Sequence, residues 1–579
     1  MNNIILFVLL GCLDSLLVYG QYYQKSILLQ GDFAFQEAAQ VINVNDTLYT
    51  VLIHPRMDTD DFYHSGLLFT DSKGTVIDTV FFREEHTNYA ATDILPNELG
   101  YGILVTKDPD NYGSLPGYPV FLQVDSLGNI LYAHEAVDTI NYKVVEQMVR
   151  TPEDGGYLAV GRVIVNNVGR YKPYLIKFSY NGTKQWEKII TDYPSTTNHL
   201  FWDVVRSTSG EYYACGVNIL VEDEIAKILL ARIDINNGSV VQDWNYNIDP
   251  YSPNNQSYCG GMKLIALNDG GILIGAQSEG ELRTGILMRL NNNKDTMWVN
   301  IEVLNDCGPR ELLYMPSDGS FVTTGCATVL YPEVSDGVQV EISKVSSSGV
   351  LLWKRHYGVD GRDDYAWGMT AAPDGGFMVV GRTYDFATQQ VPIYLLKTNC
   401  MGLLTEPEAS FSTTASTTAL TTAFQNLSQF VYPDSTDGGH FIWEFGDGTA
   451  PQINNAAFVS HTFPAYGTYT VRLTAVVCSD TSVVEQVVGV FPVGLPQIGM
   501  GGFSVYPNPA QDHLVVQNHN QEQSATFILY DVLGRQVLSF TPNNQSVVPI
   551  NHLPSGVYLY QFINPQNQIL AYGKVSVVR

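Results

Sequence analysis

Acidic side chains are the residues of this sequence best suited to catalysis, because a pair of carboxylates can cleave a glycosidic bond. Asp58, Asp60 and Asp61 stand close together, and Asp363 lies beside Asp364. Acidic residues occur on nearly every predicted loop, so both groups are interpreted as solvated loop residues. No Gly-x-Ser-x-Gly turn, His-Glu-x-x-His helix or phosphate-binding loop is present. The sequence therefore assigns no catalytic, cofactor-binding or metal-binding residue.

Cysteines are the second residue type that could do chemistry. Six of them follow Cys12, without a Cys-x-x-Cys pair or a nearby histidine pair, so structural thiols or a disulfide are favoured over a metal site. Cys259 and Cys307 hold nearly equivalent positions before two successive Asp-Gly turns. Either a disulfide between neighbouring repeats or two buried thiols explains them. The six are Cys215, Cys259, Cys307, Cys326, Cys400 and Cys478.

Composition indicates an all-β protein of several domains. The chain of 579 residues is too long for one core, and only 15% of it is charged, while Tyr, Phe, Thr, Val and Gly are plentiful. Asp and Glu outnumber Lys and Arg by 58 to 31, and a net charge of −27 argues against nucleic-acid binding. Calcium-binding EF-hand loops are absent from the sequence.

The N-terminus predicts a signal peptide over residues 1–20. Its apolar segments run from Ile4 to Leu10 and from Leu16 to Tyr19, and the sequence turns polar at Gln21. Leu9-Leu10-Gly11-Cys12 resembles a lipoprotein processing box, so lipidation of Cys12 is the alternative. No later stretch reaches the eighteen apolar residues of a membrane span.

A short motif recurs along the first two thirds of the chain: an Asp-Gly turn, a run of apolar or aromatic residues, and a further Gly. The turn supplies the positive φ that tight hairpins require. Its seven copies, three strong and four weaker, lie at Asn45-Asp46, Asn97-Glu98, Asp154-Gly155, Ser209-Gly210, Asp269-Gly270, Asp318-Gly319 and Asp374-Gly375.

A second turn alternates with the first and often precedes a strand that opens on Trp. These turns recur every 53 to 56 residues, so each unit holds two hairpins, or four short strands. Four strands at this period form a β-propeller blade, in which periodic glycines and aromatic residues pack neighbouring blades together. We therefore predict a seven-bladed β-propeller over residues 21–405. The turns lie at Gly74, Gly128, Gly182, Gly238, Lys294, Gly349 and Gly402, and the tryptophans are Trp186, Trp244, Trp298 and Trp353.

The seventh repeat is one strand short. After the turn at Gly402 only Leu403-Leu404-Thr405 remain before the composition changes, so the last blade lacks its final strand. The segment Tyr22 to Leu29 precedes the first turn and can supply it. We predict that this N-terminal strand pairs into the last blade and closes the ring, which removes an exposed edge.

These repeats resemble bacterial propeller repeats marked by an Asp-Gly-Gly turn and a downstream Lys-x-Asp-x-x-Gly, as in the segment from Leu175 to Gly182. The resemblance covers residues 22 to 405 and implies a scaffold that serves many functions. The sialidase Asp-box has two residues between Gly and Trp. Here three residues separate Gly349 from Trp353, so the box does not match.

A second β module follows, over residues 406–493. Trp443-Glu444-Phe445-Gly446-Asp447-Gly448-Thr449, His461-Thr462-Phe463 and Gly467 to Leu473 resemble the PKD domain, an immunoglobulin-like sandwich. Alternation places Tyr469, Val471 and Leu473 toward the core. His461 is interpreted as structural, pinning a turn or bonding backbone. The resemblance implies a spacer or interaction domain.

After a linker at residues 494–504, residues 505–579 are similar to the C-terminal sorting domain of the type IX secretion system of Bacteroidetes. The resemblance rests on Val505 to Pro509, Leu529 to Arg535, Leu553 to Tyr560 and Gly573-Lys574-Val575, which fit a small C-terminal β-sandwich. It implies export through the secretion machinery and removal of this domain on arrival. The implied sorting-signal residues are Pro507, Asn508, Pro509, Gly534, Arg535, Gly556, Tyr558, Gly573 and Lys574.

The sequence thus favours a secreted or cell-surface binding protein, with propeller loops that present a ligand-binding face to an extracellular polysaccharide or protein. The alternative is a secreted hydrolase or lyase that acts at the propeller mouth on extracellular polymers. Ionisable side chains that converge in the central channel with shifted pKa values would favour that alternative. A structural component of the surface layer is a third reading. The sequence favours a protein that is not an enzyme and leaves catalysis open.

Overall fold

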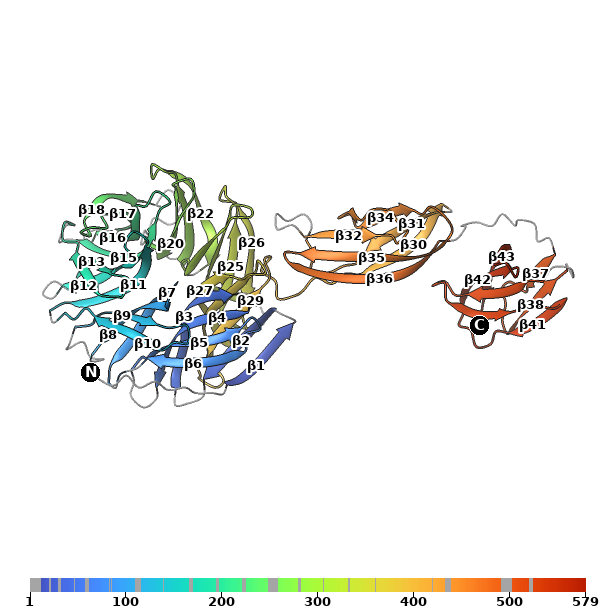
Figure 1. Ribbon diagram of the computed structural model, residues 1–579, viewed down its shortest axis with the longest axis horizontal. Coiled ribbons are helices and arrows are strands. Elements are labelled where there is room, and N and C mark those ends of the chain that lie inside the picture. Colours follow the sequence, from blue (N-terminus) through green and yellow to red (C-terminus); the bar gives the residue numbers. More distant parts are fainter. Residues whose placement is uncertain are drawn as a thin grey trace. The chain divides into compact units, whose positions relative to one another are not determined.

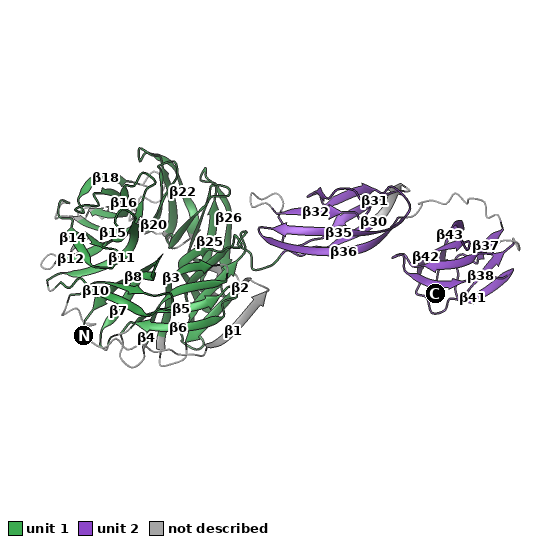
Figure 2. Ribbon diagram, in the orientation of Figure 1, with its two compact units in different colours: residues 1–406 green, residues 407–579 purple. Residues whose placement is uncertain are grey.

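The structure is a computed structural model that describes residues 12–19, 22–29, 33–45, 47–57, 62–82, 84, 86–109, 116–138, 140–165, 170–193, 197–220, 225–247, 259–279, 283–305, 307–331, 334–359, 361–418, 420–432, 439–490, 502–519 and 524–579. Contacts divide the chain into two units, Met1–Glu406 and Pro407–Arg579 (Figure 2). The regular elements of the described residues are all strands, and none of these residues forms a helix able to span a membrane. Of the predicted signal peptide, only the backbone of β1 (Cys12–Tyr19) is described.

The described strands of unit 1 pair into seven antiparallel sheets, numbered here along the chain (Figure 1). Sheets 1 to 3 contain β3 (Phe33–Asn45), β4 (Leu48–Met57), β5 (Ser65–Asp71) and β6 (Val76–Phe82); β7 (Asn88–Asn97), β8 (Gly100–Asp108), β9 (Tyr118–Val124) and β10 (Ile130–Glu135); and β11 (Tyr142–Thr151), β12 (Gly156–Val165), β13 (Arg170–Phe178) and β14 (Lys184–Ile189).

Sheets 4 to 7 repeat this meander. They contain β15 (Thr197–Arg206), β16 (Tyr212–Leu220), β17 (Ile225–Ile233) and β18 (Val240–Tyr246); β19 (Cys259–Ala266), β20 (Ile272–Glu279), β21 (Arg283–Leu290) and β22 (Thr296–Asn305); β23 (Glu311–Met315), β24 (Ser320–Tyr331), β25 (Val334–Val345) and β26 (Leu351–Tyr357); and β27 (Arg362–Ala371), β28 (Phe377–Asp385) and β29 (Ile393–Thr398) with β2 (Tyr22–Leu29) and β1.

The first strands of these sheets form a closed ring. β3 contacts β7, each later first strand contacts the next, and β27 contacts β3 again. This arrangement is a β-propeller, in which each first strand faces the axis. The predicted ring closure is confirmed, because β2 pairs antiparallel with β29 from Tyr23 opposite Lys397 to Ile27 opposite Ile393. The N-terminal strand thus covers the edge that the last sheet would otherwise expose.

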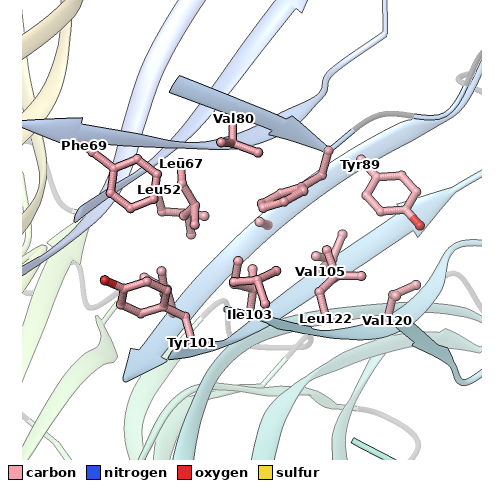
Figure 3. Packing of buried hydrophobic residues seen from close by; sticks show 14 of the residues in the cluster. Leu52, Leu67, Phe69, Val80, Tyr89, Tyr101, Ile103, Val105, Val120 and Leu122 are labelled. Atoms are coloured by element: carbon pink, nitrogen blue, oxygen red, sulfur yellow. The ribbon is translucent and has the colours of Figure 1, made fainter. Parts of the chain in front are cut away.

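Neighbouring sheets bury apolar side chains between them. Between sheets 1 and 2, Leu52, Leu67 and Val80 from one side meet Ile103 and Leu122 from the other, and all five are almost fully buried (Figure 3). Each such side chain stabilises the fold by about 1.5–3 kcal/mol. A single sheet could not bury these faces alone, so the ring is the unit that folds.

Tryptophan and glycine make a second recurring contact between sheets. A Cβ at Gly349, on the β25–β26 turn, would lie 2.6 Å from the ring of Trp298 in the preceding sheet. Gly238 and Gly402 stand in the same relation to Trp186 and Trp353, at 2.5 and 2.9 Å. The prediction that periodic glycines and aromatic residues pack neighbouring sheets together is confirmed at these three places.

Gly349→Ala is expected to lower the free energy of unfolding by about 2 kcal/mol, because a Cβ at φ 86° is strained and also meets the indole. Gly361→Ala is the matched control, since its φ is 79° but a Cβ there meets nothing within 4 Å. That control should lose only about 1 kcal/mol. Urea denaturation followed by tryptophan fluorescence measures both, and equal losses would show that the contact with Trp298 contributes nothing.

The Asp-Gly turns are fastened to the third strand of their own sheet. Lys177 Nζ lies 2.6 Å from Asp154 Oδ2, and Lys397 pairs with Asp374 in the last sheet. Arg289 with Asp269 and Lys344 with Asp318 repeat the pair. Each cation is at most 6% exposed, whereas its carboxylate partner is more open to solvent. The repeated Asp and Lys therefore hold the hairpin together and are not free to serve a ligand.

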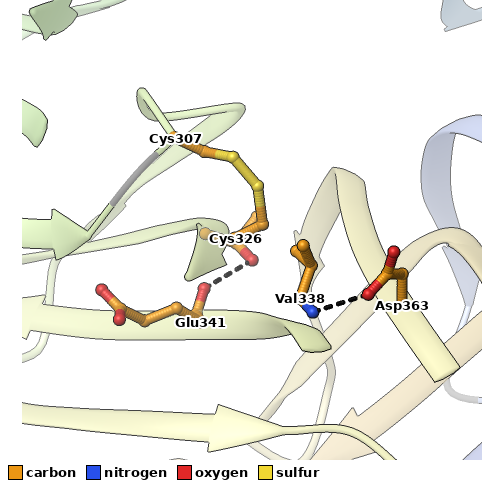
Figure 4. The surroundings of a disulfide bond; sticks show 6 residues. Cys307, Cys326, Val338, Glu341 and Asp363 are labelled. Atoms are coloured by element: carbon orange, nitrogen blue, oxygen red, sulfur yellow. Dashed lines mark hydrogen bonds between the residues drawn. A yellow bond between two sulfur atoms is a disulfide. The ribbon is translucent and has the colours of Figure 1, made fainter. Parts of the chain in front are cut away.

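One disulfide joins described cysteines of unit 1, between Cys307 and Cys326, with the Cα atoms 5.2 Å apart (Figure 4). Both expectations for Cys307 are therefore wrong, because its bond to Cys326 excludes a bond to Cys259 and also means that Cys307 is not a free thiol. Cys307 lies between β22 and β23 and Cys326 lies on β24, so the bond joins the segment that leads into sheet 6 to the second strand of that sheet. Cys215 is a buried free thiol. The side chain of Cys259 lies outside the described residues.

The described strands between Phe411 and Val490 form a sandwich of two sheets. The order is β30-β31-β34 in one and β33-β32-β35-β36 in the other. Val471 and Leu473 are fully buried while Thr470 and Arg472 are exposed, as the alternation predicts. The strands are β30 (Phe411–Thr418), β31 (Thr421–Asn426), β32 (His440–Glu444), β33 (Gln452–Ile453), β34 (Phe458–Thr462), β35 (Gly467–Val477) and β36 (Asp480–Val490).

His461 fastens a turn of this sandwich. Its Nε2 lies 2.7 Å from Asp447 Oδ2, and its ring stacks on Phe445 with centroids 3.8 Å apart. Asp447 Oδ1 accepts hydrogen bonds from the backbone and hydroxyl of Thr449. The structural interpretation of His461 is confirmed, because this ring holds the Gly446-Asp447-Gly448 turn through the carboxylate.

Acid is expected to loosen this sandwich. Burial would raise the pKa of the Asp447 carboxyl, but hydrogen bonds from Thr449 and His461 outweigh burial and hold that pKa at about 2. A carboxyl with a lowered folded pKa contributes stability above about pH 4, and this contribution is lost as the pH falls through 2. Pepsin should therefore cut residues 440–476 of the full chain much faster at pH 2 than at pH 4, after correction for its activity. Asp447→Asn should reduce that pH dependence, and an unchanged dependence would contradict the assignment.

The described strands between Phe503 and Val577 form a second, smaller sandwich. Its sheets have the orders β37-β38-β41 and β40-β39-β42-β43, around a core that includes Phe527, Leu529 and Phe562. The strands are β37 (Phe503–Tyr506), β38 (His513–Asn518), β39 (Thr526–Tyr530), β40 (Gln536–Phe540), β41 (Gln545–Pro549), β42 (Gly556–Ile563) and β43 (Ile569–Val577).

Candidate functional site

A bulge in the first strand of almost every sheet aims one extra residue at the propeller axis. The register of β11 against β12 shifts between Val145 and Gln147, so Glu146 has no opposite residue on β12. Corresponding shifts release Ala39, Thr92, Trp202, Met262 and Trp367 from β3, β7, β15, β19 and β27. In sheet 6 the equivalent residue, Arg310, immediately precedes β23 and donates its backbone N–H to Thr324 O at 2.8 Å. Bulges of this kind commonly re-aim a side chain toward a site.

These seven residues line one cavity of about 350 Å³. The volume suits a small ligand or the end of a polymer. The remaining lining side chains are mostly polar. The full lining is Glu37, Ala39, Gln40, His54, Thr92, Glu146, Gln147, Trp202, Met262, Lys263, Pro309, Arg310 and Trp367.

Two of the acidic lining residues are held in ion pairs. Glu146 pairs with Arg162, whose guanidinium also lies 5.0 Å from the ring centroid of Trp202. Glu37 pairs with Arg382 at 3.4 Å. Burial raises the pKa of Glu146 to about 7, against the opposing charge of Arg162, and burial likewise raises the pKa of Glu37 despite Arg382. His54, 4.0 Å from Glu37, has its pKa lowered by burial to about 4 and is neutral at physiological pH.

Arg310 differs from the other arginines around the cavity. Its guanidinium lies 4.6 Å from the ring centroid of Trp367, and no carboxylate among the described residues pairs with it. Burial lowers its pKa from the usual arginine value, and no neighbouring charge offsets the effect. An arginine remains charged even so. The cavity therefore contains a partly buried cation that the described protein does not neutralise.

In six of the seven sheets the residue after the bulge position is polar, and these residues form a second polar layer. Asp93 accepts hydrogen bonds from Ile94 N and, on the next sheet, Met148 N, both at 2.8 Å. Asp203 in the same way accepts from Val204 N and Leu264 N at 2.7 Å. These carboxylates thus link adjacent sheets through backbone donors, which are strong partners for a buried charge.

Lys263 is the cation of this layer. Its Nζ lies 3.3 Å from Glu311 Oε2, which also accepts a hydrogen bond from Gln40 Nε2 at 3.3 Å. Gln40 reaches Glu311 across sheet 7, where Gly368 has no side chain and a Cβ would lie 2.8 Å from Gln40 Cα. Burial would lower the pKa of Lys263, but Glu311, Asp203 and Asp93 outweigh it and raise that pKa.

Burial in this layer shifts the pKa values of its carboxyl groups. Burial raises the pKa of Asp93 to about 7 and that of Asp203 to about 6, although Lys263 and the backbone donors oppose the change. Ionisable side chains with shifted pKa values therefore do converge on the propeller axis. Within the described ranges, no three His, Cys, Asp or Glu side chains gather as a metal site would require.

The acidic residues singled out from the sequence lie elsewhere. Asp363 and Asp364 are not solvated loop residues, because both belong to β27. Asp364 is 1% exposed and accepts a hydrogen bond from Thr383 Oγ1 at 2.6 Å, while Asp363 Oδ1 accepts one from Val338 N at 2.8 Å (Figure 4). The sequence around them is polar, so it does not indicate that these carboxylates accept hydrogen bonds from residues of other strands. Residues 58–61, which include the other acidic group, lie outside the described residues.

Some of the expected sorting residues are neighbours in the small sandwich. Asn508 Nδ2 donates to Lys574 O at 3.1 Å, and Asn508 Oδ1 accepts from Ser576 N at 2.9 Å. The structure therefore brings Asn508, in the Pro507-Asn508-Pro509 segment, against Lys574 and Ser576 on β43. A Cβ at Gly573 would lie 2.3 Å from Tyr560 Oη, so glycine is required there for packing.

The other expected sorting residues lie at two separate turns. Gly534 ends the β39–β40 turn with φ 76°, and Arg535 Nε donates to Asp531 Oδ2 at 2.7 Å. Tyr558, near the start of β42, donates its hydroxyl hydrogen to Pro554 O at 2.9 Å, and Gly556 begins that strand. These contacts give each residue a role in the fold of the sandwich.

Reasoning from the sequence missed the cavity residues, yet the repeat contained a signal for them. In the five copies whose turn contains Gly, the bulge-position residue lies eight or nine positions before that Gly, as Glu146 does before Gly155 and Trp367 before Gly375. In the two copies without this Gly, Ala39 and Thr92 lie seven and six positions before Asp46 and Glu98. Residue types vary there from Ala to Trp and Arg, while the flanking pattern repeats. A variable position within a regular repeat indicates a site on a scaffold.

Comparisons with known families identify the two C-terminal modules. Residues 405–490 match the PKD domain, and residues 504–574 match the secretion system C-terminal sorting domain. The chain is therefore exported by the type IX secretion system to the cell surface or the extracellular space. No curated protein matches the chain.

Solved structures give only weak likenesses. The β-propeller domain of the Trilobed protease from Pyrococcus furiosus aligns with 64% of this chain and 96% of its own, at 11% identity and a TM-score of 0.36. Polysaccharide lyase Uly1 aligns with 64% of this chain and 92% of its own, at 8% identity and a TM-score of 0.38. Sqt1 of Saccharomyces cerevisiae aligns with 71% of this chain and 96% of its own, at 10% identity and a TM-score of 0.35. At these scores the likenesses support no argument about chemistry.

Proposed function

We propose that this exported protein is a binding protein of a Bacteroidetes cell surface, in which the propeller holds an extracellular polymer at its axial cavity. The observation that carries the proposal is the cavity itself, in which all seven sheets place a bulge-position residue. Two indoles and several amide or carboxylate groups line it, a mixture that suits the apolar faces and hydroxyl groups of a saccharide. Adhesion to such a polymer is the function that follows.

The state of the acidic residues favours binding over catalysis. A general acid or base must have a proton-transfer position free to meet the substrate. Glu146 and Glu37 are each held by an arginine, and Lys263 is held by Glu311. Their ion pairs would fix the shape of the site and orient hydroxyl groups of a ligand.

A secreted hydrolase or lyase is the second candidate, and one observation favours it. Glu146 lines the cavity with a pKa of about 7, the range in which a carboxyl group acts as a general acid near neutral pH. Ionisable groups with shifted pKa values that converge in one cavity are typical of an enzyme, so product formation must be measured together with binding.

The test uses the secreted protein without its predicted signal peptide, residues 21–579, on an array of glycans and matrix proteins. Retention of a polymer without new products supports the binding function. Time-dependent products that disappear in Glu146→Gln support the enzyme instead. Failure to retain any polymer overturns the binding proposal, and self-assembly of the purified protein would favour a structural component of the surface layer.

Export itself yields a further expectation. We propose residues 1–20 as the signal peptide, 494–504 as the linker where the sorting domain is removed, and Pro507 to Pro509 with Gly573-Lys574 as the surface recognised by the secretion machinery. Asn508 ties these two segments together. Lys574→Ala leaves the backbone contact in place, so it should retain the fold while it reduces secretion. Unchanged secretion would contradict recognition at this surface.

A further inference from the structure

Arg310 is the one arginine of the cavity lining, and its charge is left without a carboxylate by the described residues. Arg162 and Arg382 are not lining residues, and each is paired with a glutamate of the lining. Arg310 instead makes its described side-chain contact with the face of Trp367. Removing a charge from water without a partner is costly, so such a group is retained where an anion completes it.

The chemistry of that anion follows from the shape of arginine. The planar guanidinium presents paired N–H donors that match the two oxygens of a carboxylate. Burial disfavours the charged guanidinium, and the nearby indole provides only a modest electrostatic attraction. A bound carboxylate would offset the desolvation more fully than either the indole or water does.

The other lining residues favour an acidic sugar over an acidic peptide as the ligand. Glu37, Glu146, Gln40 and Gln147 surround the cavity and offer acceptor oxygens that suit a ligand rich in hydroxyl donors. A peptide with several carboxylates would meet Glu37 and Glu146 as like charges. A sugar ring with a single carboxyl group places its hydroxyls against these acceptors and its acid against Arg310.

We propose that the axial cavity is a site for a uronic-acid unit of a polysaccharide, with Arg310 binding its carboxylate and Trp367 and Trp202 flanking the sugar ring. This inference rests on the proposed binding function and names the ligand class of the same cavity. The net charge of −27 opposes an acidic polymer at long range, so local pairing with Arg310 must supply the attraction.

The test compares matched ligands on the secreted protein by isothermal titration calorimetry. Oligogalacturonate, its methyl ester, a neutral oligosaccharide of equal length and an acidic peptide are the probes. Wild-type protein should bind oligogalacturonate about 10- to 100-fold more tightly than the methyl ester. In Arg310→Gln that ratio should fall to about one, while Arg310→Lys should retain only part of it. Arg472→Gln, in the PKD sandwich and 47% exposed, is the matched control and should leave the ratio unchanged.

The outcomes separate this inference from the proposed function. Equal affinity for acid and ester in wild-type protein overturns the uronic-acid site, yet the polymer-binding function survives if both sugars bind. An undiminished ratio in Arg310→Gln assigns the acid to another place and also overturns the inference. Preference for the acidic peptide over every sugar overturns it as well. If Arg310→Gln fails to fold, equal affinity for acid and ester in wild-type protein still overturns the inference, and an undiminished ratio in Arg310→Lys does so as well.

Discussion

Lys263→Ala is expected to lower the free energy of unfolding of the propeller by about 3–5 kcal/mol at pH 8. The ammonium of Lys263 is bonded to Glu311 and also raises the stability of the ionised Asp93 and Asp203 carboxylates. Without it these buried groups keep their backbone donors but lose the cation that offsets their charge. Removing one partner of a buried ionic cluster costs far more than removing a surface charge.

The loss should be smaller at pH 5. Burial raises the folded pKa of Asp93 to about 7 and that of Asp203 to about 6, above the ordinary aspartate value. A carboxyl with a raised folded pKa contributes stability that is present below about pH 4 and is lost as the pH rises through the folded value. At pH 5 both groups are largely protonated in the folded state and need the lysine less.

Hydrogen exchange of peptides from β15, β19 and β23 measures this effect in the intact chain, because it reports the opening of the propeller itself. Lys184→Ala is the matched control, since this lysine is 38% exposed and pairs with Glu187 on the surface. That control should change stability by less than about 1 kcal/mol. A loss for Lys263→Ala that is equally large at pH 5 and pH 8 would show that the carboxyl groups do not depend on the lysine charge.

Asp374→Ala is the second large effect, with an expected loss of about 3 kcal/mol. Lys397, on β29, is 2% exposed and pairs with this carboxylate. Because β29 also pairs with β2, weakening the hairpin at Asp374 should loosen the closure of the ring. Faster exchange should therefore appear in β2 and β29 before it appears in sheets 2 to 5.

Glu211→Ala is the matched control for this prediction. Glu211 pairs with Arg232 at 2.6 Å in sheet 4, but Arg232 is 33% exposed and can be hydrated when the carboxylate is removed. The expected loss is about 1 kcal/mol or less. Equal losses at Asp374 and Glu211 would mean that burial of the cation does not determine the importance of the pair.

Local patterns in the sequence were enough to predict the fold. The Asp-Gly turns demand positive φ, and the 53- to 56-residue period allows only four short strands per unit, so the sheets, their turns and the closing strand β2 all follow from local patterns. The PKD motif around Trp443 and the tail motif around Asn508 are similarly local, and both families are confirmed.

The site could not be predicted in the same way, because its residues are far apart in the sequence and come together only in the folded ring. Glu146, Lys263 and Arg310 are ordinary polar residues in their own segments, and they meet only because each sheet turns its first strand to one axis. Asp364 shows the same limit, since a charged pair in a polar stretch is buried by strands far away in sequence. Cys307 likewise bonds to Cys326 and not to the cysteine in the equivalent repeat position.

By itself the sequence determined the repeat, its closure and the export address, because turn geometry, strand alternation and family motifs act within a few residues of each other. Only the tertiary structure decided which side chains share the axial cavity and which charges there are neutralised. Pairing and desolvation depend on neighbours that the ring brings together from all seven sheets.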